Sequence, residues 1–342
     1  MSAESFAERM SAFAARHLDL ERAPFTLPSS RIIVFRGGEG VRVHTSEYEK
    51  SLEDCRVLDE LTVRDAASRP LPITAVHPDR IEFGGGAATL GFSGTTALSL
   101  GAAVPALSAE WTTPDGRART AALDPALRFD VSPDRAVMVA PSETHHADLA
   151  ASRALWSAWF ARCPVVRDDL QEMTAFCWWV LGANIVSLPR LGDVRAVVPS
   201  KIGYVGLWQW DAYFIAAGLR HGAPELAREQ LDLAFGFPSA NGQLPDVVHE
   251  AGVLATSDDL PQADRDRLRR AGSQIADPGA PVPLTKPPLA AWALRRVWET
   301  LPPTDETRAW ARKHVATIRR SQDWWFAVSD LDGDGMPEYG HP

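Results

Sequence analysis

The spacing of apolar residues changes near residue 145, and this change constrains the fold more than any other feature of the sequence. Before it come short β-type runs separated by Gly, Pro, Asp and Ser: RIIVFRG (31–37), VRVHT (41–45), RIEFGG (80–85), ATLGFSG (88–94) and RAVMVAP (135–141). Such runs at such spacings are typical of an antiparallel sandwich. The sequence therefore predicts a β-sandwich-like domain over residues 1–145, led by a short amphipathic helix within the first twenty residues.

From about residue 147 the apolar residues recur every three or four positions, which predicts helices. We expect them in DLAASRALWSAWFARC, in DDLQEMTAFCWWVLGANIV, and over 209–220, 224–236, 286–300 and 305–327. Pro224 and Pro287 suit the first turn of a helix, where a missing N–H costs nothing. These six helices form a second predicted domain, 146–342, so the fold class is α+β.

Two long segments, 187–207 and 237–284, read as loops between the predicted helices. Loops of that length in a compact domain are usually functional or disordered. The stretch 256–281 is rich in Asp, Arg, Gly and Pro. It predicts either a mobile lid or a solvated insertion.

Composition excludes several classes of partner. The formal net charge is −9, with no run of Lys or Arg, which argues against a nucleic-acid ligand. No apolar stretch is long enough to span a bilayer, and the first twenty residues lack the apolar core of a secretory signal. Three cysteines, without metal-like spacing, do not suggest a disulfide framework. We therefore expect a cytoplasmic protein that binds a neutral polyol or sugar-like small molecule, and an oligomer remains open.

The segment GLWQWDAYF offers a sugar subsite. The indole faces of Trp208 and Trp210 can pack against the C–H face of a pyranose, and the carboxylate of Asp211 can accept hydrogen bonds from vicinal hydroxyls. Asp211 also falls at a predicted helix N-terminus, where a carboxylate can cap backbone N–H groups. The alternative is that both tryptophans are core residues and Asp211 is only a cap.

Two further segments carry polar residues of interest. NGQLPDVVHE places Gln243, Asp246, His249 and Glu250 around a turn, although the His–Glu pair has no metal-site spacing. Lys286 precedes a predicted helix, where its ammonium is unfavourable unless an acidic or hydroxyl-rich group faces it. A functional lysine and a solvated lysine are both consistent with the sequence.

The segment SDLDGDGMPEYGHP has the spacing of a calcium loop. Asp330, Asp332 and Asp334 stand where such a loop carries its first three ligands, with Gly335 at the sharp bend. Glu338 could complete the set. His341 stands where an EF-hand requires a bidentate Glu, which excludes an EF-hand but leaves a structural Ca²⁺ site open. The alternative is an Asp/Gly turn without metal.

Taken in order, GLWQWDAYFIAAGLR, NGQLPD, TKPPLAAWA and DWWFAVSDLDGDGMPEYG resemble glycoside hydrolase family 63. That family contains processing α-glucosidases, bacterial α-glucosidases and glucosylglycerate or mannosylglycerate hydrolases. The resemblance covers residues 200–342 and implies an (α/α)6 barrel of twelve helices, of which the six predicted here would form the first half. The β-rich region corresponds in position to the family's N-terminal sandwich but carries no specific motif.

The resemblance also implies inverting hydrolysis of α-glucosides or α-mannosides by a carboxylic acid and a carboxylate base. The acid, an Asp in a Ser-Gly-x-Asp segment, and the base, a Glu, match no residue of this sequence, so no catalytic residue is assigned. We therefore expect a truncated, inactive chain that could still bind sugar. The residues carried over to the sugar site are Trp208, Trp210, Asp211, Gln243, Asp246 and Lys286, and Tyr339 is expected to bind substrate as well. Those carried over to Ca²⁺ are Asp330, Asp332 and Asp334, to which the loop spacing adds Glu338.

Two other hypotheses remain open. Half a barrel would expose the apolar inner faces of its helices. A non-catalytic carbohydrate-binding or scaffold protein could cover them by self-association. The second is a trehalase-like or debranching hydrolase, against which the TKPP and DGDGMPEYG segments weigh.

Overall fold

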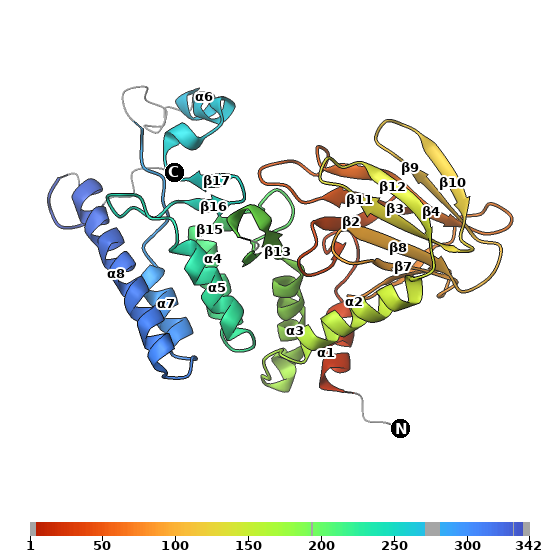
Figure 1. The fold of residues 1–342 in the computed structure, drawn as a ribbon, viewed down its shortest axis with the longest axis horizontal. Helices are drawn as coiled ribbons and strands as arrows, with labels where there is room; N and C mark the ends of the chain where they lie inside the picture. Colours follow the sequence, from red (N-terminus) through yellow and green to blue (C-terminus); the bar gives the residue numbers. More distant parts are fainter. Residues whose placement is uncertain (1–4, 193, 271–280, 331, 338–342) are drawn as a thin grey trace. The chain divides into compact units, whose positions relative to one another are not determined.

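The chain divides into two compact units (Figure 1). The computed structural model describes residues 5–192, 194–270, 281–330 and 332–337. Unit 1 comprises Met1–Val186 and Ser200–Val205, and unit 2 comprises Ser187–Pro199 and Gly206–Pro342.

Unit 1 contains two six-stranded antiparallel sheets. The first has the order β1-β2-β3-β4-β9-β10, with strands Phe25–Thr26, Ile32–Gly37, Gly40–Thr45, Arg56–Arg64, Ser108–Thr112 and Ala118–Ala122. The second has the order β12-β11-β8-β7-β6-β5, with strands Val137–Ser142, Ala126–Val131, Ala97–Ala102, Ala88–Phe92, Ile81–Phe83 and Ile73–Val76. All five predicted runs form strands.

The two sheets pack as a sandwich because alternate residues of their strands face a shared core. In β9 the buried residues are Ala109 and Trp111, with partly exposed residues between them. The Trp111 ring meets Phe129 of β11 at 5.4 Å, edge to face, and Phe25 of β1 lies 5.1 Å from Phe92 of β7. These pairs join strands of opposite sheets, so the two sheets share a core. The register of paired strands confirms the predicted antiparallel sheets.

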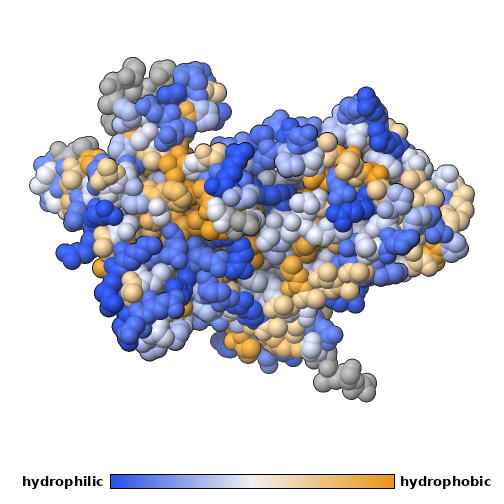
Figure 2. Space-filling model, viewed as in Figure 1, coloured by the Kyte–Doolittle hydropathy of each residue, from blue (hydrophilic) through white to orange (hydrophobic). Residues whose placement is uncertain are grey.

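Three helices complete unit 1: α1 (Phe6–Ala15), α2 (His145–Phe160) and α3 (Asp168–Ala183). The last strand of the two six-stranded sheets ends at Ser142, close to the predicted boundary at residue 145, but α2 and α3 belong to the unit that contains these sheets. The reason is packing: α2 lies against β7 and β8, and a Cβ at Gly91 would lie 2.4 Å from Leu149 of α2. Figure 2 shows hydrophobic residues on the surface where α2 ends and α3 begins; among them are Val165, Leu170 and Met173.

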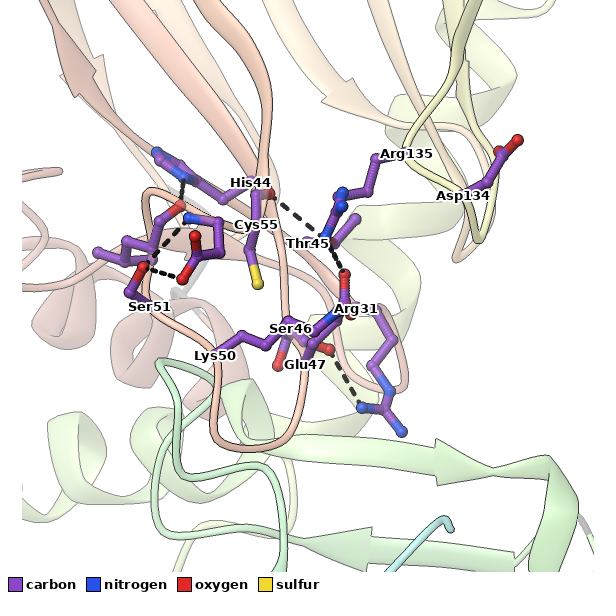
Figure 3. Close-up of polar contacts among 12 residues, drawn as sticks. Arg31, His44, Thr45, Ser46, Glu47, Lys50, Ser51, Cys55, Asp134 and Arg135 are labelled. Atoms are coloured by element: carbon purple, nitrogen blue, oxygen red, sulfur yellow. Dashed lines mark hydrogen bonds and ion pairs between the residues drawn. The ribbon is translucent and has the colours of Figure 1, made fainter. Parts of the chain in front are cut away.

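A polar network fixes the loop between β3 and β4 (Figure 3). Glu47 in this loop pairs with Lys50 and accepts a hydrogen bond from Arg135, at 3.0 Å, beside β12 of the other sheet. Arg31 donates to the backbone oxygen of Ser46 at 3.1 Å. These contacts join the loop to both sheets, so we interpret the network as structural.

Unit 2 is mainly helical. Its helices are α4 (Gln209–Leu219), α5 (Pro224–Ala234), α6 (Gln262–Arg270), α7 (Ala290–Trp298) and α8 (Asp305–Val328). A three-stranded sheet is formed by β15 (Leu207–Trp208), β16 (Val247–His249) and β17 (Gly252–Leu254). The hairpin of β13 (Ile185–Leu188) and β14 (Val194–Val197) stands where the chain passes between the units.

The structure corrects two details of the sequence prediction. The expected loop 237–284 contains β16, β17, a short 3-10 helix (Ser257–Asp259) and α6, so seven α-helices rather than six follow the sheets in the described residues. Pro287 precedes α7 instead of standing in its first turn, whereas Pro224 does begin α5. Residues 271–280 of the predicted lid lie outside the described residues.

Within the described ranges, we find no helix that combines the length and the apolar character required to cross a bilayer.

Candidate functional site

Three of the motif segments converge in unit 2. Strand β15 pairs antiparallel with β16, which places Trp208 opposite Val247. The backbone N–H of Gln209 extends this pairing, because it donates to the backbone oxygen of Asp246 at 2.9 Å. The pairing therefore brings the start of α4, with Trp208 and Asp211, beside the NGQLPDVVHE segment.

Lys286 joins this cluster through its side chain. Its Nζ lies 2.9 Å from Oδ1 of Asp246 and 5.5 Å from the centroid of the Trp208 ring. The Asp246 side chain is only 6% exposed and that of Lys286 is 25% exposed. The ammonium does face an acidic group, which is the condition under which a lysine is tolerated ahead of a helix. A buried carboxylate needs such a partner because desolvation of an unpaired charge is costly.

Asp211 lies in the first turn of α4 and is partly buried. It is not the N-cap residue: Trp208 stands at that position, without a side-chain cap hydrogen bond. Burial raises the pKa of Asp211, and the Lys286 ammonium opposes part of that rise. A carboxylate that loses water in the free protein is suited to accept hydrogen bonds from a ligand that replaces the water.

Gln209 is the residue that sequence reasoning missed. Its side chain is 4% exposed, and Nε2 donates to the Pro245 oxygen at 3.1 Å and to Oγ1 of Thr285 at 3.3 Å. The side-chain Oε1 of Gln209 accepts a hydrogen bond from the backbone N–H of Lys286 at 3.3 Å. Gln209 thus ties together all three segments. The only sequence signal for it is a polar residue between two tryptophans at a helix start.

Gln243 is also buried and acts as a brace between loops. Its Nε2 donates to the backbone oxygens of Ala255, at 2.6 Å, and Leu284, at 2.8 Å. Both amide protons are therefore engaged by the protein. Only the side-chain oxygen of Gln243 could serve a ligand.

The two tryptophans have different environments. Trp208 is 8% exposed beneath Lys286, whereas Trp210 is 42% exposed. Trp210 packs edge to face on Phe214 at 6.1 Å, and Phe214 lies 5.4 Å from Trp292 of α7. Trp210, Phe214 and Trp292 form a row of rings that we call the aromatic row. Trp210 thus belongs to a different group of side chains from Trp208.

The acidic segment after α8 brings its carboxylates together. One ligand atom from each of Asp330, Asp332 and Asp334 lies within 4.8 Å of the others. The loop is curled by backbone N–H groups that donate to these carboxylates, among them Gly335 to Asp330 at 3.1 Å. The remaining predicted residues, Glu338 and Tyr339, lie outside the described residues.

Comparison with known proteins identifies the domain in the C-terminal part of the chain. Residues 204–342 match the family model of the mannosylglycerate hydrolase MGH1-like glycoside hydrolase domain. Mannosylglycerate hydrolases MGH2 and MGH1 of Selaginella moellendorffii are each 27% identical over 146 residues, which is 42% of this chain. The matched stretch spans 28% of the length of these relatives.

A bacterial glucoamylase complexed with acarbose aligns with 90% of this chain and 67% of its own chain, at 11% identity and a TM-score of 0.35. The family model covers the same segments that carry the predicted resemblance. Over residues 204–342, therefore, the chain is similar to the mannosylglycerate hydrolase MGH1-like glycoside hydrolase domain.

Proposed function

We propose that unit 2 supplies the sugar-binding part of an inverting hydrolase of α-glucosides or α-mannosides, such as glucosylglycerate or mannosylglycerate. The observation that carries the proposal is the convergence of Trp208, Asp246 and Lys286 from three separate segments. Gln209, which follows Trp208, forms hydrogen bonds with the other two segments. These segments belong to the matched domain. The printed names of the relatives support a sugar substrate.

Each residue has a distinct proposed role. Asp211 accepts hydrogen bonds from sugar hydroxyls, since burial leaves its carboxylate poorly solvated. Lys286 donates to a hydroxyl or a substrate carboxylate while Asp246 holds its position. Trp210 in the aromatic row offers an exposed ring face for a pyranose. Gln209 and Gln243 position the loops.

The proposed chemistry needs a general acid and a general base. Neither the Ser-Gly-x-Asp segment nor the base Glu of the resemblance matches a residue of the printed sequence. We therefore assign no catalytic residue and expect this chain alone to bind sugar without hydrolysing it. We further propose that α4, α5, α7 and α8 form part of an (α/α)6 barrel.

We also propose a structural Ca²⁺ ion at Asp330, Asp332 and Asp334. Three carboxylates whose oxygens lie within 4.8 Å of one another fit a hard cation with oxygen ligands. A thermal unfolding scan tests this: Ca²⁺ should raise the unfolding temperature, EDTA should reverse the rise, and Asp332→Asn should diminish it. Equal effects of Ca²⁺ on the wild type and the variant would contradict the site.

Isothermal titration of the 342-residue chain with mannosylglycerate, glucosylglycerate and glucose tests the sugar site. We expect saturable binding of at least one of them, lost in Asp211→Ala and weakened in Trp210→Ala. Trp298→Ala, an exposed tryptophan of α7 outside the aromatic row, is the matched control and should bind normally. Absence of binding by the correctly folded wild type, or equal loss in the control, would refute the proposal.

A second candidate is a non-catalytic carbohydrate-binding or scaffold protein that self-associates. The exposed aromatic row favours it, because Trp210 and Phe214 are 42% and 51% exposed. Light scattering should then show an oligomer that Phe214→Ser dissociates. A monomer at all concentrations would remove this candidate.

A further inference from the structure

Unit 1 contains a small pocket that the proposed sugar site does not use. Its volume is ≈ 150 Å³, and it is bounded by α3, by the segment that leads into β1, and by residues 200–202. Apolar side chains form part of its wall, namely Ala23, Pro24, Phe176, Trp179, Val180, Ala183 and Ile202. The polar lining residues are Arg22, Thr26, Asn184, Ser200 and Lys201. No carboxylate is among the lining residues.

Lys201 is the most unusual of these residues. It is only 2% exposed, and its Nζ donates to Oγ1 of Thr26 at 3.2 Å and to the Leu27 oxygen at 3.0 Å. In the described ranges no carboxylate forms an ion pair with it. Arg31 adds a further positive charge nearby, and Arg22 lines the same pocket. Burial holds the pKa of Lys201 well below its usual range.

The position of Lys201 is held by a second contact. Its backbone N–H donates to Oδ1 of Asn184 at 3.2 Å, at the end of α3. A lysine with a long stem usually extends its ammonium into water. Here both the backbone and the side chain are bonded inward, so the amine is retained at the pocket wall.

Trp179 supplies a second buried donor. It is 4% exposed, and in the part of the chain that the structure describes its Nε1 has no hydrogen-bond partner. Its ring stacks on Phe176 at 5.7 Å and 9°. A buried N–H without an acceptor is unfavourable, and native proteins rarely retain one without a reason. Trp179 is one of the residues that line the pocket.

We propose that this pocket binds a small organic monocarboxylate. The carboxylate oxygens would accept from Lys201 and Trp179, and the short carbon chain would lie against the apolar side of the wall. A charge-assisted bond to an ammonium is among the strongest hydrogen bonds that a protein makes. The apolar residues favour a carboxylate with a carbon body over inorganic phosphate. The site lies in unit 1 and is independent of the proposed sugar site.

Calorimetric titration of the full chain with propionate tests the proposal, with propionamide as the neutral isostere and inorganic phosphate as the competing anion. We expect propionate to bind at least tenfold more tightly than either. When the titration is run at a pH above the lowered pKa of Lys201, binding should also take up a proton, because a carboxylate favours the ammonium form of Lys201. The measured enthalpy should therefore depend on the ionisation enthalpy of the buffer.

The variant Lys201→Met keeps the stem and removes the amine, so it should weaken propionate binding at least tenfold and abolish the proton uptake. Lys50→Met, at an exposed lysine of the same unit, is the matched control and should change neither. Trp179→Phe should weaken binding without affecting the proton uptake. The proposal is overturned if propionamide binds as tightly as propionate, if phosphate binds more tightly, or if the wild type binds propionate without proton uptake.

Discussion

Removal of the Lys286 ammonium should destabilise the folded site far more than removal of a comparable surface charge. The side chain of Asp246 is 6% exposed, and the Nζ of Lys286 lies 2.9 Å from its Oδ1. Loss of one partner of a buried pair costs ~3–5 kcal/mol, because the other charge is left uncompensated. Since Lys286 is itself 25% exposed, we expect about 3 kcal/mol for Lys286→Met, at the lower end of this range.

The converse substitution should cost less. In Asp246→Asn the lysine remains, and its partly exposed ammonium can turn toward water, so we expect about 1 kcal/mol. The double variant should be more stable than the sum of the single effects predicts, with a coupling energy of roughly 1–3 kcal/mol. Arg295→Met is the control. It breaks an exposed pair of 2.7 Å with Glu299, for which we expect a much smaller effect because solvent screens the two charges.

Hydrogen exchange measures this effect locally, which avoids treating two units as one cooperative transition. Amides of β15 and β16 should exchange about 100-fold faster in Lys286→Met, since 1.4 kcal/mol corresponds to a factor of ten. Amides of the sheets in unit 1 should be unchanged. If Lys286→Met and Arg295→Met accelerate β15 and β16 equally, the pair is not buried in solution and the reasoning fails.

Three other substitutions or treatments have defined outcomes. Burial raises the pKa of Asp211, so the contribution of this residue to stability is greatest at low pH and is lost as pH rises through that pKa. Asp211→Asn should therefore raise the unfolding temperature at neutral pH but not in acid. Burial alone would raise the pKa of Asp232, but hydrogen bonds from His314 and Trp310 lower it. Asp232→Ala should therefore cost about 1–2 kcal/mol in urea unfolding at neutral pH, and the cost should fall as pH falls through that pKa. Iodoacetamide should label Cys177, which is exposed, and spare Cys55 and Cys163, which are buried. Burial raises the pKa of both buried thiols, that of Cys163 to about 12.

Each of these outcomes can fail. A lower unfolding temperature of Asp211→Asn at neutral pH would contradict the burial of that carboxylate. An effect of Asp232→Ala that is the same in acid would show that the hydrogen bonds to His314 do not depend on the charge. Intact mass spectrometry that finds all three thiols labelled at equal rates would contradict the burial of two of them.

Much of the local structure follows from the sequence. The predicted helix 305–327 is found as α8, Asp305–Val328, and the strand runs before residue 145 are found in the two sheets. Periodicity reports which residues of an element are buried, and caps such as Thr304 mark where a helix begins. Strands such as β8 and β10, ALSLGA and ARTAA, were missed because small residues give no clear alternation.

The candidate site was predicted as residue types but not as an arrangement. The motifs in 204–342 sufficed to suggest the glycoside hydrolase resemblance. For Lys286 the sequence left open either an acidic or hydroxyl-rich partner or a solvated side chain. Which acid it meets could not be inferred, because Asp246 is forty positions away. The two residues are brought close by hydrogen bonds that Gln209 and Gln243 make with residues 284–286. For the same reason Gln209, whose partners lie in two other segments, carried no recognisable signal.

The sequence by itself determined that strands dominate the first 145 residues and helices much of the rest, that residues 204–342 resemble a glycoside hydrolase domain, and which polar residues are candidates, since these depend on local pattern and side-chain chemistry. Only the tertiary structure decided that α2 and α3 join the sandwich, that Trp208 is buried beneath Lys286 while Trp210 is exposed, and that Lys201 is enclosed at a pocket. The physical reason is that burial and charge pairing depend on neighbours in space. Local spacing shows which face of an element avoids water, but not what that face meets.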